Sequence, residues 1–513
     1  MPQLRDSSNQ GPGNTTSRSP EYDSFHRIFG IETEYGVSVT RANHPCDPGQ
    51  VAMMMFAPIL SRSRSTNTYL ENGSRLYLDV GSHPEYATAE ARDPAEALVQ
   101  DLAGEQIMRR LAIGAQERLR KTHGEHATIH LFKDNVDSAG HAFGCHENYL
   151  VRRYVSLPII KAQLLPFLVT RQLFTGSGRV SESGFEITQR AAFLDEGVSS
   201  STTRFRPMVN TRDEPHADPD EFRRLHVIIG DSNRSQWATK MKLATTHLVL
   251  CVMEDAAKRG AASGFECCAL SDPSASNKAM SADLSCAKTV IGLEDIAAFR
   301  RTQREFGLQS PDSDADASTD SKADSQAVTA LEIQYLYWTV VSRFVESHRV
   351  QIESSLPDTN CTTILREWKT ALDALSAKDF DGLSNRVDWV AKYQLLGKMK
   401  ERNPSLSPAQ ARQIDMNYHD IVNGSIYPLL VGHGLMETLV SDGAVEYAVK
   451  NPPHDTRAAL RGGFVHRALQ SGATFSCDWT HLKTTAPTHH EAVLIDPFAF
   501  MPDDRYRLLV ASL

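Results

Sequence analysis

The segment Gly30–Val39 (GIETEYGVSV) sets two glutamates, Glu32 and Glu34, among apolar and β-branched residues. Alternate residues of a β-strand share a face, so the two carboxylates project together. Like charges on a half-buried face repel each other and lose hydration unless cations compensate them. Mg²⁺ prefers oxygen ligands and is commonly held by one or two carboxylates plus substrate phosphates. The pair therefore predicts a metal site under a nucleotide, with a solvent-facing strand edge as the alternative.

A second polar face follows the turn sequence NG at residues 72–73. On the strand after that turn, Arg75, Tyr77 and Asp79 share one face, which predicts a polar wall rather than core. The bend GSHP then returns the chain through Glu85 toward the same place. Parity sets Glu85 and Thr88 on opposite faces of an ideal strand, so one of them must lie at an irregularity if both function. Taken alone, Asp79 is also compatible with a structural salt bridge.

Histidines and arginines add further candidates. His146 follows a glycine-containing loop in GCHENYL, and His226 lies in LHVIIGD, which is typical of a buried strand. Arg212 and Arg224 belong to an arginine-rich stretch, and arginines beside acidic residues suit phosphate. Singly, each is equally compatible with a satisfied core histidine or a surface ion pair. Neither GxxxxGK[ST] nor GxGxxG occurs, so a bound nucleotide has to lie on metals, arginines and a sheet face.

A sheet is needed to bring these side chains together. Segment Asp93–Leu119 repeats apolar residues at helical spacing between strand-like segments, which predicts a sheet covered by helices. Further helices are expected at 327–348, 393–400 and 409–422. Strands are expected at Ile28–Val39, Arg75–Val80, Glu85–Glu90 and Thr128–Phe132.

Composition divides the chain and excludes some functions. Residues 1–25 predict a disordered leader, 26–430 a large catalytic domain with a mobile insertion at about 265–326, and 431–513 a small C-terminal domain. A formal charge of -9 argues against a general nucleic-acid binder. No apolar run approaches the ~20 residues of a membrane span. Eight scattered cysteines without a CxxC pair indicate reduced thiols and a cytoplasmic location.

Several motifs, taken in order, resemble the Pup ligase family, whose relatives are glutamine synthetase and other carboxylate–amine ligases. The matching stretches include GIETEYGV, NGSRLYLDVGSHPEYATAE, GCHENYL, NTRDEPHAD, NPPHDTRAALRG and DWTHLK. They run from Arg27 to Leu513, apart from the expected insertion. The resemblance implies an α+β fold: a glutamine synthetase-like large domain with a curved, mainly antiparallel sheet covered by helices, plus a small C-terminal domain.

The resemblance also implies an activity. Family members use ATP and Mg²⁺ to phosphorylate the C-terminal glutamate side chain of prokaryotic ubiquitin-like protein. They then join it by an isopeptide bond to lysines of target proteins, which are thereby marked for the bacterial proteasome. The family pattern assigns Glu32, Tyr77 and Glu85 to magnesium, Arg75, Thr88 and Trp479 to ATP, and Asp79 to the catalytic base. Analogy with glutamine synthetase adds Glu34, His146 and His226 as metal ligands and Arg212 and Arg224 as phosphate clamps.

Three other functions remain open. The sister enzyme of the family deamidates the modifier and removes it from targets, but it carries a long extra loop for which the interval Val37–Leu70 has no room. A small-molecule glutamate–amine ligase explains the metals but not the chain-wide match. A non-enzymatic proteasome scaffold disagrees with the intact set of acidic residues.

Overall fold

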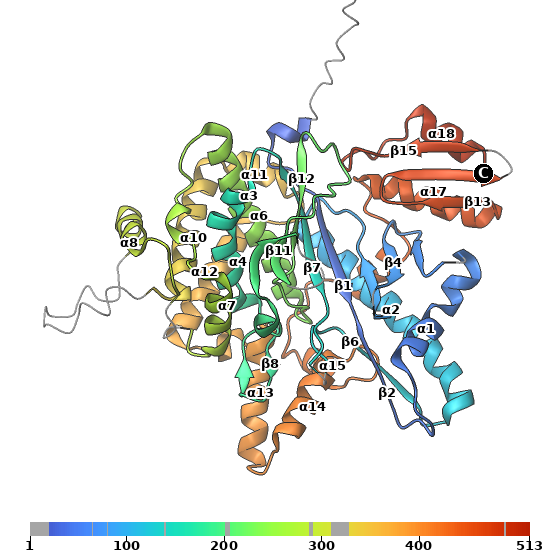
Figure 1. Cartoon of the computed structure of the whole chain (residues 1–513), viewed down its shortest axis with the longest axis horizontal. Helices are drawn as coiled ribbons and strands as arrows, with labels where there is room; N and C mark the ends of the chain where they lie inside the picture. Colours follow the sequence, from blue (N-terminus) through green and yellow to red (C-terminus); the bar gives the residue numbers. More distant parts are fainter. Residues whose placement is uncertain are drawn as a thin grey trace, which may run out of the picture.

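The 513-residue chain folds around one large sheet, shown in the computed structural model of Figure 1. The expected leader is shorter than residues 1–25, because η1 (Pro20–Asp23) already packs Tyr22 against the rings of Tyr154 and Phe222. Residues 1–19 lie outside the part of the chain that the structure describes. That part comprises residues 20–63, 65–79, 81–137, 140–200, 206–286, 291–308, 328–486 and 489–513.

The large sheet has eight strands and is mainly antiparallel, with one parallel pair, β10 and β11. Sequence order and spatial order differ, so β1 lies between β7 and β5. The α+β fold predicted from the sequence is confirmed. In spatial order the strands are β10 (Glu196–Ser199), β11 (Pro207–Asn210), β12 (Phe222–Val227), β7 (Cys145–Arg152), β1 (Phe29–Glu34), β5 (Pro84–Ala87), β4 (Arg75–Leu78) and β3 (Asn67–Tyr69).

Strand β1 alternates in burial as its sequence predicts. Phe29, Ile31 and Thr33 are buried, whereas Glu32 and Glu34 are only partly covered. The single strand expected at Ile28–Val39 is divided, because the chain leaves the large sheet at Tyr35. It continues as β2 (Gly36–Thr40), which pairs with β6 (Thr128–Phe132) in a separate two-stranded sheet.

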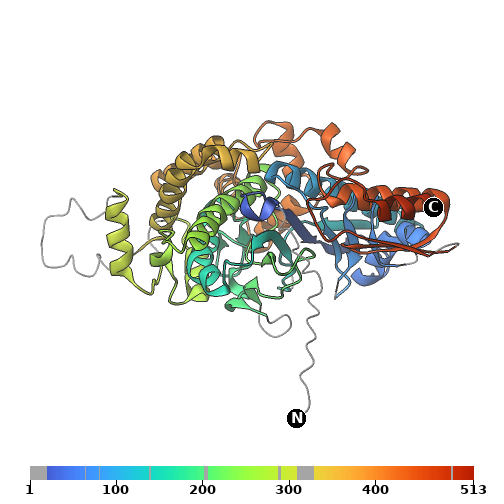
Figure 2. The ribbon, with the colours of Figure 1, turned by 90° about the horizontal axis from the view of Figure 1, so that it is seen from above.

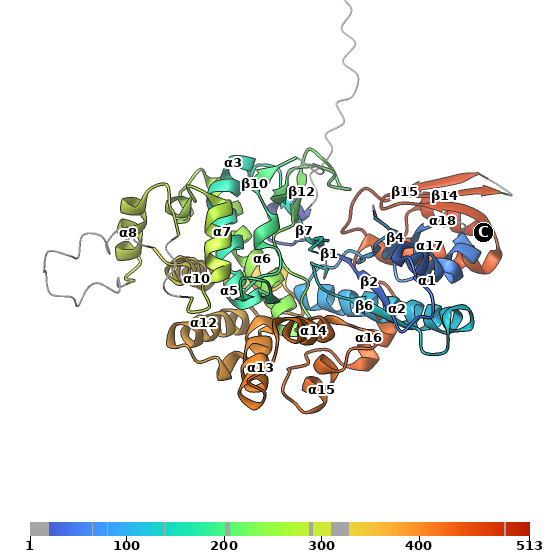
Figure 3. The same ribbon diagram turned by 60° about the horizontal axis from the view of Figure 1, so that its bottom comes forward.

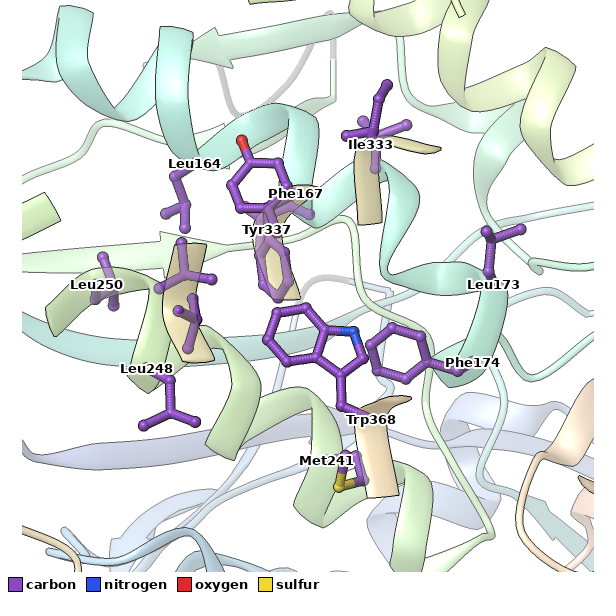
Figure 4. Packing of buried hydrophobic residues seen from close by; sticks show 14 of the residues in the cluster. Leu164, Phe167, Leu173, Phe174, Met241, Leu248, Leu250, Ile333, Tyr337 and Trp368 are labelled. Atoms are coloured by element: carbon purple, nitrogen blue, oxygen red, sulfur yellow. The ribbon is translucent and has the colours of Figure 1, made fainter. Parts of the chain in front are cut away.

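Two long helices run behind the apolar face of β1 and β7. Helix α2 (Pro94–His123) begins at the N-cap Asp93, whose side chain accepts a hydrogen bond from the Ala95 amide. Helix α6 (Gln236–Arg259) is capped in the same way by Ser235. The helical side of the molecule holds the main core, in which Trp368 packs among aromatic and aliphatic side chains (Figure 4). The opposite face of the sheet is left for polar residues.

The stretch expected to be a mobile insertion is largely packed. Phe265 and Phe299 are fully buried in the main core, and short helices surround them. The prediction of an insertion at about 265–326 is therefore wrong for the described residues 265–286 and 291–308, and residues 309–327 lie outside the description. The elements are η4 (Glu266–Cys268), α7 (Pro273–Ala282) and α8 (Ile296–Glu305).

The C-terminal part forms a small unit beside the sheet, coloured red in Figures 1 and 2. Its three strands, β13 (Thr474–Cys477), β14 (His481–Ala486) and β15 (His490–Val493), pack on α17 (Arg457–Ser471) and α18 (Asp504–Ala511) around Phe464. The unit begins later than residue 431, because Met436 packs with Tyr418 and Tyr427 of the preceding helices.

The remaining elements complete the helical layers seen in Figures 1 and 3. Within the described residues, no helix is both long and apolar enough to cross a membrane. The helices expected at 327–348, 393–400 and 409–422 are present as α10 (Ala330–Ser347), α13 (Asp388–Arg402) and α14 (Pro408–His419). Strands β8 (Arg179–Val180) and β9 (Phe185–Glu186) form a two-stranded ribbon. The other helices of the described residues are α1 (Pro48–Ser63), α3 (Leu157–Ile159), η2 (Ile160–Leu164), α4 (Leu165–Thr170), α5 (Gln172–Thr175), η3 (Ala191–Phe193), α11 (Arg349–Ser355), α12 (Cys361–Ala377), η6 (Asp381–Leu383), α15 (Ile426–Gly432) and α16 (Asp442–Ala448).

Candidate active site

Strands β1, β5 and β4 bring three predicted residues onto one face. Glu34 lies directly opposite Glu85 in the β1–β5 pairing, and Glu85 lies opposite Tyr77 in the β5–β4 pairing. Directly opposed residues of antiparallel strands share a face. We call this surface, with Asp79, the acidic face.

Asp79 joins the acidic face from a tight loop just after β4. The Asp79 amide donates to the His83 carbonyl oxygen at 3.0 Å, and the Ser82 amide donates to the Asp79 carbonyl oxygen at 2.9 Å. Gly81 and Ser82 take the positive φ values, 92° and 64°, that turn the chain so sharply. One carboxylate oxygen each of Glu34, Asp79 and Glu85 lies within 4.8 Å of the others.

The acidic face is short of positive charge. Burial raises the pKa of Glu85 well above its usual range, and the negative charges of Glu32 and Glu34 raise it further. For Glu34, burial also favours the uncharged form, but interactions with His83 and His146 outweigh it and lower the pKa. His83 Nδ1 lies 3.6 Å from Glu34 Oε2. Clustered carboxylates that protein cations leave uncompensated fit a bound divalent metal.

Glu32 belongs to a neighbouring group with two histidines. His146 Nδ1 lies 3.2 Å from Glu32 Oε2, and Asn148 Nδ2 donates to Glu32 Oε1 at 3.1 Å. His226 Nδ1 lies 2.8 Å from the side-chain oxygen of Asn148. One donor atom each of Glu32, His146 and His226 lies within 4.8 Å of the others. The side-chain amide of Asn148 thus joins the group, a contact that was not predicted although strand alternation from His146 signals it.

The electrostatics of this second group differ from those of the acidic face. Burial opposes ionisation of Glu32, but the hydrogen bond from His146 and the nearby positive charges outweigh it and lower the pKa of Glu32. Burial, then the charges of His146 and Arg224, lowers the pKa of His226 to about 3. His226 is therefore neutral at pH 7, the form in which imidazole binds a metal.

A pocket opens beside Glu32, and it encloses about 570 Å³ of empty space with its mouth included. Thr88 lines it at the irregularity that parity requires: β5 ends at Ala87, and the Thr88 hydroxyl accepts a hydrogen bond from the Ile31 amide at 3.0 Å. Trp479 reaches the pocket from the C-terminal unit. Its other lining residues include Gly30, Glu90, Asn148, Pro215, His216, Arg224 and Arg457.

The three predicted arginines differ in their position relative to the pocket. Arg224 lines the pocket, and its guanidinium lies 3.6 Å from Glu32 Oε1. Arg75 stacks over the Tyr77 ring at 4.0 Å and donates to Asn67, at the far edge of the acidic face. Arg212 does not line the pocket: its side chain is 64% exposed and pairs with Glu214 at 2.8 Å, while the other carboxylate oxygen of Glu214 lies 4.0 Å from Arg224. The role of Arg212 as a phosphate clamp stays a prediction.

A buried ion cluster joins the pocket to the C-terminal unit. Glu90 accepts hydrogen bonds from Arg457 Nε at 2.7 Å and from both terminal nitrogens of Arg461. Arg461 also stacks over Trp479, with its guanidinium carbon 4.8 Å from the ring centre. These arginines were not predicted, although both lie in the motif NPPHDTRAALRG. Their contacts hold Trp479 beside Thr88.

Clustered carboxylates beside an arginine- and tryptophan-walled pocket, on an antiparallel sheet backed by helices, define a candidate metal- and nucleotide-dependent enzyme. A family model described as "Pup-ligase protein" matches residues 27–483. The chain belongs to the Pup-ligase family.

Curated and solved relatives agree with this assignment. Pup--protein ligases of Bifidobacterium longum (strain DJO10A) and Bifidobacterium dentium are 58% and 55% identical, with all of each chain covered. A crystal structure of the complex between prokaryotic ubiquitin-like protein Pup and its ligase PafA is 33% identical, with a TM-score of 0.80, and covers 95% of this chain and 91% of that one. A structure of the Pup ligase PafA in complex with ADP is 34% identical, with a TM-score of 0.73, and covers 91% and 94%.

Proposed function

We propose that this protein is an ATP-dependent ligase that joins the C-terminal glutamate of prokaryotic ubiquitin-like protein to lysines of target proteins. The observation that carries the proposal is the meeting of Asp79 with Glu34 and Glu85, beside a pocket that Thr88 and Trp479 line. Identity of 58% to a Pup--protein ligase along the full length of both chains supports it. Tagging of the targets for the bacterial proteasome is part of the proposal.

The donor atoms of the acidic face suit Mg²⁺. Glu34, Tyr77 and Glu85 would hold it, and its charge would offset the repulsion between ATP and the carboxylate of the modifier. Glu32, His146 and His226 form the second donor set, although imidazole nitrogen suits Mg²⁺ less well than carboxylate oxygen does. The raised pKa of Glu85 is the sign that this face lacks a cation of its own.

The pocket residues act on the nucleotide. Trp479 offers an aromatic ring at the pocket wall, and the Thr88 hydroxyl lies at the end of β5. The Arg224 guanidinium lies 3.6 Å from Glu32 Oε1. Phosphate oxygens of the nucleotide would bind the same guanidinium, beside or in place of the Glu32 carboxylate. Arg75 would reach the same nucleotide from β4.

Asp79 acts on the incoming lysine. A lysine ammonium has an unperturbed pKa of ~10.4 and is not nucleophilic until it loses a proton. Asp79 is half-buried on a surface loop, so its carboxylate faces both the acidic face and an arriving side chain. It accepts the proton while the amine attacks the activated glutamate, and the isopeptide bond forms as phosphate leaves.

The interval between the first strand and the NG turn favours the ligase over the deamidase. It is filled by β2, the 16-residue helix α1 and β3, with short connections between them. Val51, Met55 and Phe56 of α1 are buried, so the helix is an integral part of the fold. A cytoplasmic location is also proposed, since all eight cysteines are free thiols.

Incubation with ATP, Mg²⁺, modifier ending in glutamate and a lysine-bearing protein tests the proposal. Conjugates seen by mass spectrometry support it. Ammonia release from modifier ending in glutamine, without conjugates, assigns the deamidase instead. Activity toward free glutamate and a small amine, without the modifier, assigns a small-molecule ligase.

A further inference from the structure

Among the fully buried arginines of the described residues, Arg190 stands apart. Six others each have a carboxylate oxygen within 4.0 Å: Arg27, Arg152, Arg171, Arg234, Arg457 and Arg461. Arg190 is 2% exposed, and no carboxylate oxygen of the described residues lies within 4.0 Å of its guanidinium nitrogens. Its Nε has no hydrogen-bond partner among the described residues, a feature that it shares with Arg152, Arg171 and Arg234.

The guanidinium of Arg190 lies where β7 and β12 separate. The pairing of these strands ends at Glu147 and Val227. Just beyond that point, Arg190 Nη1 donates to the Ile228 carbonyl oxygen at 2.7 Å and approaches the Cys145 carbonyl oxygen at 3.4 Å. His146 and His226 are adjacent in sequence to Glu147 and Val227, and both belong to the group around Glu32. The positive charge therefore stands at the inner end of the candidate active site.

Arg206 carries a second guanidinium without an ion pair among the described residues. Arg206 is exposed, and its Nη1 donates to the Ala142 carbonyl oxygen at 2.5 Å. Burial lowers the pKa of Arg190, the charge of Glu34 partly offsets this, and the charge of Arg206 lowers it further. The two guanidinium groups repel each other, and the burial of Arg190 makes a further anion beside it favourable.

We propose that Arg190 and Arg206 bind an oxyanion of the reacting substrates, so that Arg190 is a catalytic residue of the site. This inference rests on the proposed function. The fork geometry of guanidinium matches the oxygens of phosphate and carboxylate groups. The oxyanion is either the terminal phosphoryl group of ATP or the carboxylate of the last residue of the modifier.

Binding measurements with the variants Arg190→Met and Arg206→Met distinguish the two sources. If the phosphoryl group is bound, affinity for ATP falls at least tenfold while affinity for ADP stays within twofold of wild type. If the carboxylate is bound, affinity for full-length modifier falls at least tenfold, to that of modifier lacking its last residue, which itself is unchanged. Either result supports the proposal. Arg259→Met, at the exposed end of α6, serves as the matched control and keeps wild-type affinities.

Folding is checked separately by thermal melting. Should Arg190→Met not fold, Arg190→Lys and Arg206→Met decide, because Lys keeps the charge but loses the fork and Arg206 is exposed. Affinities for ATP, ADP and modifier that all stay within twofold of wild type overturn the proposal, even if conjugation falls. Failure of the wild-type protein to conjugate modifier at all defeats the proposed function instead, and nucleotide binding still tests the phosphoryl source.

Discussion

The acidic face and the junction with the C-terminal unit each bury a glutamate from the same stretch of chain. At the junction, Glu90 is held by Arg457 and Arg461, and its pKa is lowered to about 2 because these charges outweigh the effect of burial. On the acidic face, burial and the charges of Glu32 and Glu34 raise the pKa of Glu85 well above its usual range. The charge of Glu90 is balanced within the chain, whereas Glu85 on the acidic face has no comparable cationic partner among the described residues.

The largest effect is expected at Asp79, the carboxylate of the face that we assign to proton transfer. Asp79→Asn should lower the rate of conjugation by about 10²–10⁴-fold, the usual contribution of a general base. Affinity for Mg–ATP should stay within about twofold, since the change removes a base rather than a principal metal ligand. Single-turnover conjugation and calorimetric ATP binding measure the two. Nucleotide affinity that falls as steeply as activity would contradict this role, and Asp504→Asn on the exposed face of α18 is the control.

The junction is tested by Glu90→Gln. Loss of this charge leaves two buried guanidinium groups without a carboxylate, which typically costs about 3–5 kcal/mol of the free energy of unfolding. We expect the C-terminal unit to loosen first, with faster proteolysis around Arg457–Trp479. Chemical denaturation followed by tryptophan fluorescence measures the loss. Stability equal to wild type would show that the junction is not held by this ion cluster.

On the acidic face, replacing Glu85 by Gln should have a different effect on stability from Glu90→Gln. Glu85→Gln resembles the uncharged form that burial already favours, so stability without metal should not fall. Saturation with Mg–ADP at 100 times its Kd stabilises a binding protein by about 2.7 kcal/mol, and the variant should lose most of that gain. Melting curves with and without Mg–ADP, and with EDTA, measure both. If the variant is less stable than wild type without metal but gains the full stabilisation from Mg–ADP, the proposed difference between the two regions is wrong.

Glu32 sharpens the same distinction. Glu32→Ala removes a carboxylate that His146 and Arg224 partly neutralise, so we expect weaker Mg-dependent nucleotide binding but a smaller change than at Glu85. Titration of ADP at several Mg²⁺ concentrations measures it. An unchanged affinity at every concentration means that Glu32 holds no metal.

The smallest effect concerns pH, at Glu96 in the first turn of α2. Burial and the nearby Asp455 raise its pKa from the ordinary 4.5 to about 8. Its stabilising contribution is therefore complete below pH 4.5 and is lost as the pH rises through 8. Relative to Glu96→Gln, the wild-type protein should lose stability between about pH 4.5 and pH 8, and the loss should level off above pH 8. Melting temperatures across that range test it, with the exposed Glu117→Gln as control, and parallel curves would refute it.

Local patterns predicted the acidic face well. Strand alternation alone predicts that Glu32 and Glu34 share a face, and that Tyr77 shares a face with Arg75 and Asp79. It also predicts an irregularity between Glu85 and Thr88, and β5 ends at Ala87, just before Thr88. The failures depend on long-range contacts. The pairing of Glu90 with Arg461 joins residues 371 positions apart, and the lack of a described carboxylate within 4.0 Å of Arg190 cannot be predicted without the fold.

Arg212 lies in an irregular loop, where no periodicity tells the direction of a side chain, so its role stays a prediction. One error has a local cause. The composition predicts an insertion at about 265–326 because this stretch shows little periodic pattern and ends in a Ser/Asp-rich tract. Yet Asp272 before Pro273 and Asp295 before α8 are helix N-caps, and this signal was available in the sequence.

The position of Trp479 also bears on how the protein comes into being on the ribosome. The carboxylates and Thr88 emerge early in synthesis, but the aromatic wall arrives only with the last part of the chain, together with the arginines that secure it. A nascent or prematurely terminated polypeptide would therefore present an open half-pocket. Such a product would lack the Trp479 ring, so we expect it to bind nucleotide more weakly than a polypeptide that includes α17 and Trp479.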